Sequence, residues 1–365
     1  MIEIGGAAQA VDPGLLRAPG GFVWWYADVV TPQGDGAVLI WSYGLPFLPG
    51  YADASRRGRP QLPISRPSVN LVVYRRGVPA FYLLQEHAPA PVDEGALTEV
   101  QRIGGCTFRR QVVDGRCTLS AVLDCELPGT ADRLCGTWTL TGAARRDAGA
   151  RVAASEHVWT PLTGPCEAVV DLSVGGRPLG VIRGRGYHDR NGGRVPLHDL
   201  GIGRWMWGRF PFAGQERIYY LLWPRAAGAE MIAAGVAIGA DGRTEQVPLR
   251  VELGRERMTF GGLRRPERIV LRHGGDVWLD VRHTVVSDAG PFYLRLLSEG
   301  SVGGETVAGW SELVHPDRVD LARHRPFVRM RVHQPSGTNS PWLPLFTGPR
   351  AGRPARLVRH MLGLG

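Results

Sequence analysis

The sequence predicts an all-β protein built from barrels or sandwiches. Roughly fifteen segments rich in β-branched and aromatic residues follow one another at spacings of about 8–12 residues, and Gly, Pro or Asp residues bound them. The dipeptides Asp35-Gly36, Asp114-Gly115, Asn191-Gly192 and Asp241-Gly242 each predict a tight hairpin. Helical patterns do not alternate with the predicted strands, which argues against a doubly wound α/β fold.

The first half of the chain is expected to form one series of strands. Its segments are β-branched, aromatic or alternating in polarity, as buried and half-buried strands are. In chain order the predicted strands are 22–30, 37–43, 69–74, 80–85, 117–125 and 136–141.

A second series of strands follows a Gly-rich stretch at 186–203. The length of 365 residues suits about two domains. A boundary near Leu200 gives an N-terminal β domain at 1–199, with most of the candidate site residues, and a C-terminal β domain at 200–365 with a basic tail. The predicted strands of the second series are 205–212, 217–223, 230–238, 246–253, 258–260, 268–272, 277–286 and 292–298.

Helices are scarce, and the best candidate is the tail at 354–364. Leu357, Val358, Met361 and Leu362 form an apolar stripe there beside arginines. Such a helix is expected to cap a barrel, and contact with a membrane is the alternative.

The charged residues exclude several chemistries. All 43 basic residues are Arg, against 34 acidic ones, and the formal net charge is +9. Without Lys, neither a phosphate-binding loop of the Gly-Lys type nor a Lys Schiff base can form. The arginines are scattered as single residues and pairs, which indicates a solvated cationic surface and no nucleic-acid partner.

The cysteines and the N-terminus bear on the compartment. The chain has five Cys and no Cys-x-x-Cys pair, so no zinc spacing is present and no metal is expected. Because no signal peptide is visible, the expected location is a reducing cytoplasm.

The candidate catalytic residues lie in two short clusters. His157 and Trp159 are two residues apart, as are Tyr187 and Asp189, so each pair shares one face of a strand. The alternative is a core His beside a core Trp, with Asp189 bonding only the amides of a turn at Asn191-Gly192.

Aromatic residues gather near the same clusters. The candidate substrate-binding residues form a pocket wall, although aromatic residues in strands are most often core. These residues are Trp24, Tyr26, Trp205, Trp207 and His188.

This set of side chains favours acid chemistry on an apolar substrate. No arrangement of an activated nucleophile is evident. A carboxylic acid in an apolar pocket stays protonated and can donate a proton at neutral pH. Trp and Tyr faces can stabilise a carbocation. Together these properties describe acid-catalysed addition or cyclisation on an alkene.

The sequence resembles the carotenoid 1,2-hydratases (hydroxyneurosporene synthases), which are two-domain lipocalin-like proteins. Four stretches carry the resemblance: GGFVWWYADV at 20–29, HVWTPL at 157–162, GRGYHDRNGGRVPLHDLGIGRWMWGRF at 184–210 and RIYYLLW at 217–223. The order HxW, GYHDxNxG and WxW is more specific than any single piece. Arg190 and the Arg-rich tail depart from the family pattern.

The resemblance implies a fold, a reaction and roles for the clusters. The fold is a pair of lipocalin-like (calycin-like) β-barrels, and the reaction adds water across the terminal 1,2 double bond of an acyclic carotenoid without a cofactor. Asp189 then protonates C2, Trp159 and Tyr187 stabilise the cation at C1, and His157 orients Asp189 or accepts a proton from water.

Two other functions remain open at this stage. The same scaffold also hosts terpenoid cyclases and pericyclases, and a non-catalytic carrier of an apolar ligand would need only the pocket. The expected partners are an apolar isoprenoid or carotenoid, water and, transiently, a membrane surface. The expected location is therefore cytoplasmic, or peripheral on the inner membrane.

Overall fold

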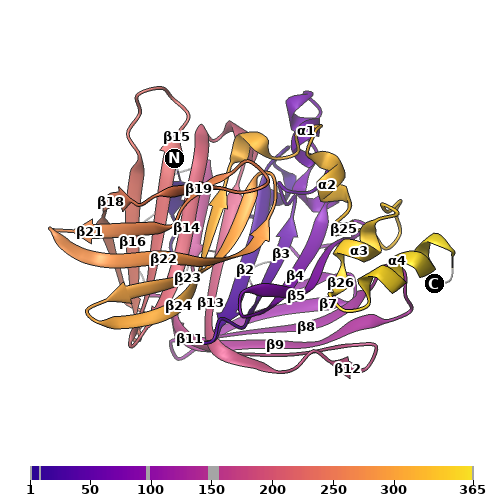
Figure 1. Cartoon of the computed structure of the whole chain (residues 1–365), viewed down its shortest axis with the longest axis horizontal. Coiled ribbons are helices and arrows are strands. Elements are labelled where there is room, and N and C mark those ends of the chain that lie inside the picture. Colours follow the sequence, from indigo (N-terminus) through magenta and orange to yellow (C-terminus); the bar gives the residue numbers. More distant parts are fainter. Residues whose placement is uncertain (1, 8–9, 96–98, 147–155, 364–365) are drawn as a thin grey trace.

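Two curled β-sheets packed side by side make up most of the protein. The computed structural model describes residues 2–7, 10–95, 99–146 and 156–363. Within these ranges nearly all strand pairs are antiparallel, and the few short helices gather on one side of the molecule (Figure 1). The all-β prediction is thereby confirmed.

The first sheet has fifteen strands and is formed mainly by the N-terminal half of the chain. Four short strands lie off its main path: β1 (Ile2–Ile4), β10 (His157–Pro161), β12 (Arg177–Pro178) and β26 (Gly348–Pro349). The main path runs in the order β25 (Val332–His333), β5 (Val78–Glu86), β4 (Pro67–Arg75), β3 (Gly36–Tyr43), β2 (Phe22–Val30), β13 (Ile182–Gly193), β11 (Thr163–Val174), β9 (Arg133–Ala144), β8 (Arg116–Glu126), β7 (Cys106–Val113) and β6 (Val100–Ile103).

The second sheet has nine strands and curls almost into a barrel. Its two edge strands, β17 and β18, are separated in sequence by Leu249 alone, so the two edges of the sheet meet there. A two-stranded ribbon of β19 (Glu256–Met258) and β20 (Arg264–Pro266) lies beside it. The path is β17 (Thr244–Pro248), β16 (Ile232–Gly239), β15 (Gln215–Pro224), β14 (Ile202–Phe212), β24 (Glu305–Val314), β23 (Tyr293–Val302), β22 (Asp276–Ala289), β21 (Arg268–His273) and β18 (Arg250–Leu253).

Alternation along the strands divides the apolar side chains into three layers. On β2, Trp25 faces the interior of the first sheet, whereas Trp24 and Tyr26 face the second sheet. On β14, Met206 faces the interior of the second sheet, whereas Trp205 faces the first. The middle layer therefore lies between the sheets and receives side chains from both.

A buried ion triad joins the two sheets. Arg209 on β14 pairs with Asp28 on β2 of the first sheet and with Glu216 on β15, and all three side chains are fully buried. Arg209 also donates to the carbonyl of Arg185 at 3.0 Å, and its guanidinium lies 5.9 Å from the ring centre of Tyr187.

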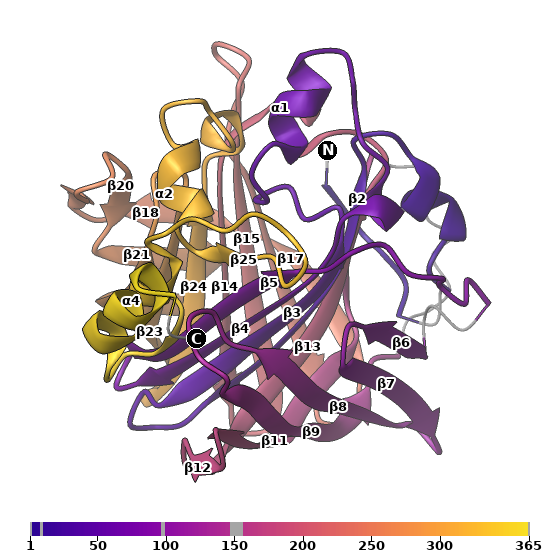
Figure 2. The same cartoon turned by 90° about the vertical axis from the view of Figure 1, so that its right-hand side faces the viewer.

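The C-terminal segment returns from the second sheet to the first. After β24 it forms α2 (Arg325–Arg329), α3 (Leu343–Phe346) and α4 (Arg353–Met361), and its strands β25 and β26 both pair with β5 (Figure 1). Figure 2 shows α2, β25 and α4 of this segment from another side. The remaining helices are α1 (Tyr51–Arg56) and four 3-10 turns, at Pro13–Arg17, Pro63–Ser65, Leu197–Asp199 and Pro316–Arg318. None of the helices formed by the described residues is long and apolar enough to cross a membrane.

Most predicted strands are confirmed, and two expectations are wrong. Asn191-Gly192 does not form a hairpin, because β13 runs unbroken through both residues. A side chain at the next residue, Gly193, would lie 2.6 Å from the ring of Phe22, so these glycines serve close packing. The predicted strand 246–253 is divided after Pro248, which has no N–H to donate to a ladder. The division into domains at 1–199 and 200–365 stays a prediction, although the sheets change between β13 and β14.

Removing the central cation of the triad should destabilise the protein. Arg209→Met leaves the carboxyl groups of Asp28 and Glu216 buried without their cationic partner, and we expect a loss of about 3–5 kcal/mol in the free energy of unfolding. Denaturant-induced unfolding followed by tryptophan fluorescence measures this loss. Arg282→Met is the matched control, because its ion pair with Glu299 is exposed and should contribute about 1 kcal/mol or less. Equal losses for the two variants would contradict the role of the triad.

Candidate active site

Asp189 lies in the middle of β13, between β2 on one side and β10 on the other. Its register partners are Tyr26 on β2 and Pro161 on β10, and the residue is 3% exposed. Trp159 Nε1 donates to its Oδ2 at 2.8 Å, and the Tyr187 hydroxyl donates to the same oxygen at 3.0 Å. Because these two short bonds converge on Oδ2, and Oδ1 receives only the longer 3.3 Å bond from Asn191 Nδ2, Oδ1 is the oxygen that carries the proton.

Burial makes Asp189 a neutral acid. Loss of hydration is the largest influence and raises the pKa of Asp189 to about 8, against the two hydrogen bonds from Trp159 and Tyr187, which lower it. The carboxylates of Glu312 and Asp28 raise the pKa further. The side chain is therefore mostly protonated at neutral pH and can donate a proton.

His157 reaches this acid through Asn191. Its Nε2 lies 3.1 Å from Asn191 Oδ1, and Asn191 Nδ2 lies 3.3 Å from Asp189 Oδ1. Burial lowers the pKa of His157 to about 4, so the ring is neutral and carries its hydrogen on Nε2 when Asn191 Oδ1 accepts it. His157 is thus placed to orient Asn191, which in turn touches the acid.

Asp189 faces a narrow inner pocket between the two sheets. Its volume is about 30 Å³, which suits a water molecule or the tip of an apolar chain. Side chains from β2, β10 and β13 form one wall, and side chains from β14, β15 and β24 form the other. The lining residues are Trp24, Tyr26, Trp159, Asp189, Asn191, Trp205, Trp207, Tyr220 and Glu312.

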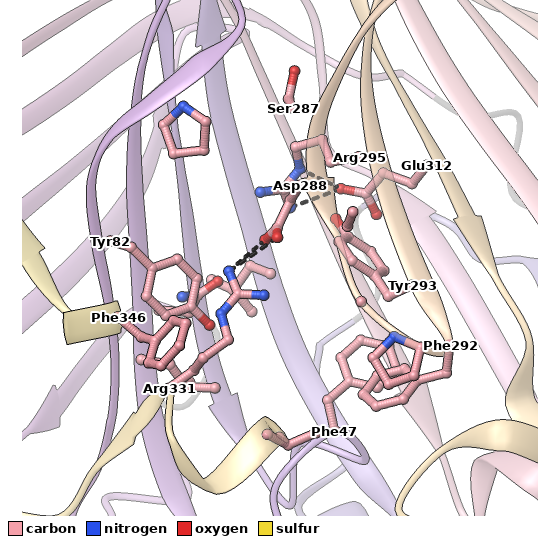
Figure 3. A pocket seen from close by; sticks show the side chains of 18 of the residues that line it. Phe47, Tyr82, Ser287, Asp288, Phe292, Tyr293, Arg295, Glu312, Arg331 and Phe346 are labelled. Atoms are coloured by element: carbon pink, nitrogen blue, oxygen red, sulfur yellow. Dashed lines mark hydrogen bonds and ion pairs between the residues drawn. The ribbon is translucent and has the colours of Figure 1, made fainter. Parts of the chain in front are cut away.

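A much larger cavity adjoins the inner pocket. Its volume is about 610 Å³, and it runs between the sheets towards the C-terminal segment. Aromatic residues such as Phe47, Tyr82 and Phe292 line it, together with two ion pairs, Asp288–Arg331 and Arg295–Glu312 (Figure 3). The wall shared by the two spaces consists of Trp24, Tyr26, Trp205 and Glu312.

The structure brings together eight of the nine residues singled out from the sequence. Tyr187 supports Asp189 from behind the pocket wall, and its ring packs 5.6 Å from that of Trp207. His157 packs 6.0 Å from the ring of Trp205. The other residues of this group line the inner pocket: Trp24, Tyr26, Trp159, Asp189, Trp205 and Trp207.

His188 is the exception and does not line the cavity. Its Nδ1 lies 2.7 Å from the carbonyl oxygen of Tyr26, and its ring packs against Phe108 in the interior of the first sheet. The reason is the alternation of β13, which places His188 on the face opposite Tyr187 and Asp189.

Several residues of the site were not found from the sequence. Tyr220 on β15 and Glu312 on β24 line the inner pocket, and Arg295 on β23 holds Glu312. Asn191 was interpreted only as a turn residue. The pattern RIYYLLW around Tyr220 offered a signal, whereas Glu312 stands in an ordinary alternating strand far from the clusters.

The arrangement suits proton transfer to an apolar double bond. A neutral acid, surrounded by indole and phenol rings, stands at the end of an apolar cavity. In the described ranges no group of three or more His, Cys, Asp or Glu side chains is placed to hold a metal ion.

Comparisons with known proteins agree with this geometry. The sequence profile of the family "Carotenoid hydratase CrtC" matches residues 44–340. A protein of Chlorobaculum tepidum named hydroxyneurosporene dehydrogenase is 28% identical over 345 residues, which cover 87% of this chain and 88% of the relative. The acyclic carotenoid 1,2-hydratase of Thiocapsa roseopersicina is 28% identical over 334 residues, covering 86% of this chain and 74% of the relative.

A solved structure shares the fold. A protein of Nitrosomonas europaea described as AttH superposes with a TM-score of 0.54 at 14% sequence identity, covering 87% of this chain and 99% of that one. At this identity the likeness concerns the architecture of the two sheets alone.

Proposed function

The chain belongs to the carotenoid hydratase family, and we propose on that premise that this hydro-lyase adds water across the terminal 1,2 double bond of an acyclic carotenoid, without a cofactor. The observation that carries the proposal is the buried carboxyl group of Asp189, which Trp159 and Tyr187 hold at the inner end of an apolar cavity. The family and its relatives support the substrate class, and the geometry of the site supports the role of the acid.

Asp189 acts as the general acid. It gives its proton to C2, and the positive charge then resides on C1, a tertiary carbon. The indole of Trp159 and the other aromatic rings of the inner pocket face this charge, which their electron-rich faces stabilise. Water adds to C1 and, after losing a proton, leaves a tertiary alcohol.

Hydrogen bonds from Trp159 and Tyr187 become stronger as Asp189 loses its proton. Both donors point at Oδ2, so they stabilise the carboxylate that forms in the transition state. His157 and Asn191 hold the other oxygen in place. Trp159 therefore serves both the acid and the cation, whereas Tyr187, behind the pocket wall, serves the acid alone.

Replacing the acid should stop turnover and leave binding intact. Asp189→Asn keeps the shape of the neutral side chain but cannot donate the proton, so we expect hydration to fall by at least about 10²-fold. Chromatography and mass spectrometry of detergent-dispersed lycopene or neurosporene measure a product heavier by one water. Tryptophan quenching measures binding, which should persist.

The same assay separates the competing functions. A product of unchanged mass indicates a cyclase or another isomerase. Binding with no product from the wild-type protein, on any acyclic carotenoid, indicates a carrier. Full activity in Asp189→Asn would refute the role of Asp189 as the acid.

The pH dependence should follow the protonated form of Asp189. Because the pKa of this side chain is raised to about 8, kcat/KM should be level at neutral pH and fall as the pH rises through about 8. The pKa of Glu216 is also raised to about 8 by burial, so Glu216→Gln serves as the control and should keep the same alkaline limb. A rate that rises with pH across this range would mean that Asp189 works as a base.

We also propose that the protein takes its substrate from a membrane surface. Exposed apolar side chains of the C-terminal segment lie at and near the large cavity: Phe327 and Phe346 line it, and Met361 is exposed on α4, which packs on α3. Arg350 and Arg353 line the same cavity. Apolar groups interspersed with cations are what an anionic bilayer attracts.

Binding to vesicles should depend on this end of the molecule. The double variant Phe327→Ser with Met361→Ser should reduce partitioning into anionic vesicles at low salt by on the order of tenfold or more. The control is Met258→Ser with Phe260→Ser, which removes exposed side chains from the ribbon region; Met258 and Met361 are both 64% exposed. Co-sedimentation measures the partitioning, and equal loss in the two double variants would contradict the assignment of this face.

A further inference from the structure

We propose that Glu312 binds the attacking water and accepts its proton. The inference rests on the proposed hydration and concerns the step after Asp189 has acted. Asp189 supplies a proton to the double bond, but the hydration also needs a group that delivers water to C1 on the path of the substrate.

Glu312 stands where the large cavity meets the inner pocket. Asp189 lines the inner pocket, and an isoprenoid lying in the large cavity can bring its terminal double bond there across the shared wall. Glu312 belongs to the wall shared by both spaces. Figure 3 shows Glu312 at the large cavity, held by Arg295. Because Glu312 also lines the inner pocket, its carboxylate is beside an isoprenoid end that comes within reach of Asp189.

Arg295 fixes the carboxylate of Glu312. The two residues are directly opposite each other on β23 and β24. Arg295 donates to Glu312 Oε1 through Nε at 3.0 Å and through Nη2 at 2.8 Å, and its Nη1 donates to the Tyr74 hydroxyl at 2.8 Å. Both bonds to Glu312 end on Oε1. Among the described residues no hydrogen bond ends on Oε2, so this oxygen can accept one from water.

A second polar group of the inner pocket lacks a partner. Trp207 is 5% exposed, and its buried Nε1 has no hydrogen-bond partner among the described residues. A buried donor without a partner commonly binds an ordered water. Trp207 and Glu312 are register partners on β14 and β24, so a water in the pocket can use Trp207 Nε1 as a donor and Glu312 Oε2 as an acceptor.

The proton balance of the reaction closes with these groups. The O–H bond of Asp189 breaks and a C–H bond forms at C2, which leaves the carboxylate of Asp189 and a cation at C1. The water oxygen bonds to C1, and the resulting oxonium gives one proton to Glu312. Exchange with solvent then returns a proton to Asp189 and removes one from Glu312, so that one water is consumed per alcohol formed.

Charge supports the same assignment. Before the reaction, the carboxylate of Glu312 helps to keep Asp189 protonated. During the reaction the carboxylate of Glu312 stands near the cation at C1. Arg295 balances the charge of this carboxylate and holds it in place, so that it does not form a bond to C1.

Reaction in D₂O tests the proposal, because it separates protonation from water capture. A cation that water fails to capture loses a hydrogen again, and whenever this is protium from C2 or from a methyl group on C1, the recovered alkene retains the deuterium that Asp189 added at C2. Glu312→Gln should lower the yield of alcohol by about tenfold or more and leave deuterium incorporation into the recovered alkene within about threefold of the wild-type value. Mass spectrometry of product and recovered substrate, at mildly acidic pH where Asp189 stays protonated, measures both.

Two further variants make the test specific. Trp207→Phe keeps an aromatic ring and removes the Nε1 donor, so it should shift the ratio of alcohol to deuterated alkene in the same direction. Glu299→Gln makes the same chemical change on the exposed ion pair with Arg282 and should leave the ratio unchanged. Tryptophan quenching and the unfolding midpoint establish that each variant binds substrate and folds.

The outcomes distinguish this inference from the proposed function. If Glu312→Gln loses alcohol and deuterium incorporation equally, or keeps full hydration, the role of Glu312 in water capture is overturned. An unchanged ratio in Trp207→Phe would overturn the water site. If the wild-type protein gives neither alcohol nor deuterated alkene from any acyclic carotenoid, the proposed hydration itself fails.

Discussion

The contact between Asp28 and Arg209 is the constraint on which the site depends. These charges come from different sheets and have no access to water, so each must hold the other at hydrogen-bond distance. Burial raises the pKa of Asp28, and Arg209 opposes that rise. The same guanidinium lies over the ring of Tyr187, whose hydroxyl meets Asp189. A single buried cation therefore fixes the spacing of the sheets and the position of a residue that contacts the acid.

The acid itself is maintained at the expense of stability. In the unfolded chain Asp189 ionises at the pKa of an ordinary carboxyl group, whereas in the folded protein its pKa is about 8. Between these two values the unfolded state binds fewer protons than the folded one. The free energy of unfolding therefore falls as the pH rises through this window, and it recovers when the pH is lowered and Asp189 is protonated again. Such a residue persists in a core where it performs chemistry, since Asn would fill the same space without this loss.

The alternation of side chains along a strand predicted which residues of one strand share a face of the site. It placed His157 with Trp159 and Tyr187 with Asp189, and the same rule puts His188 on the opposite face, where the structure has it. What the sequence could not supply is the pairing of distant strands. Glu312 lies 123 positions after Asp189 in the chain and enters the pocket only because β24 pairs with β14. Asn191-Gly192 has the composition of a turn, and only the packing of Phe22 on Gly193 explains its place in a strand.

The site lies between the sheets because their interiors are already filled. Trp25, Trp41 and Trp138 pack inside the first sheet, and Phe210, Leu271 and Leu279 pack inside the second. A chain as long as an isoprenoid needs an elongated space, and the junction of two curved surfaces provides one without a void in either core. At this junction the first sheet contributes Asp189 and the second contributes the ion pair of Arg295 and Glu312. Because Asp189 and Glu312 belong to different sheets, neither sheet alone forms the pocket, and the buried triad that joins the sheets helps to hold the two walls together.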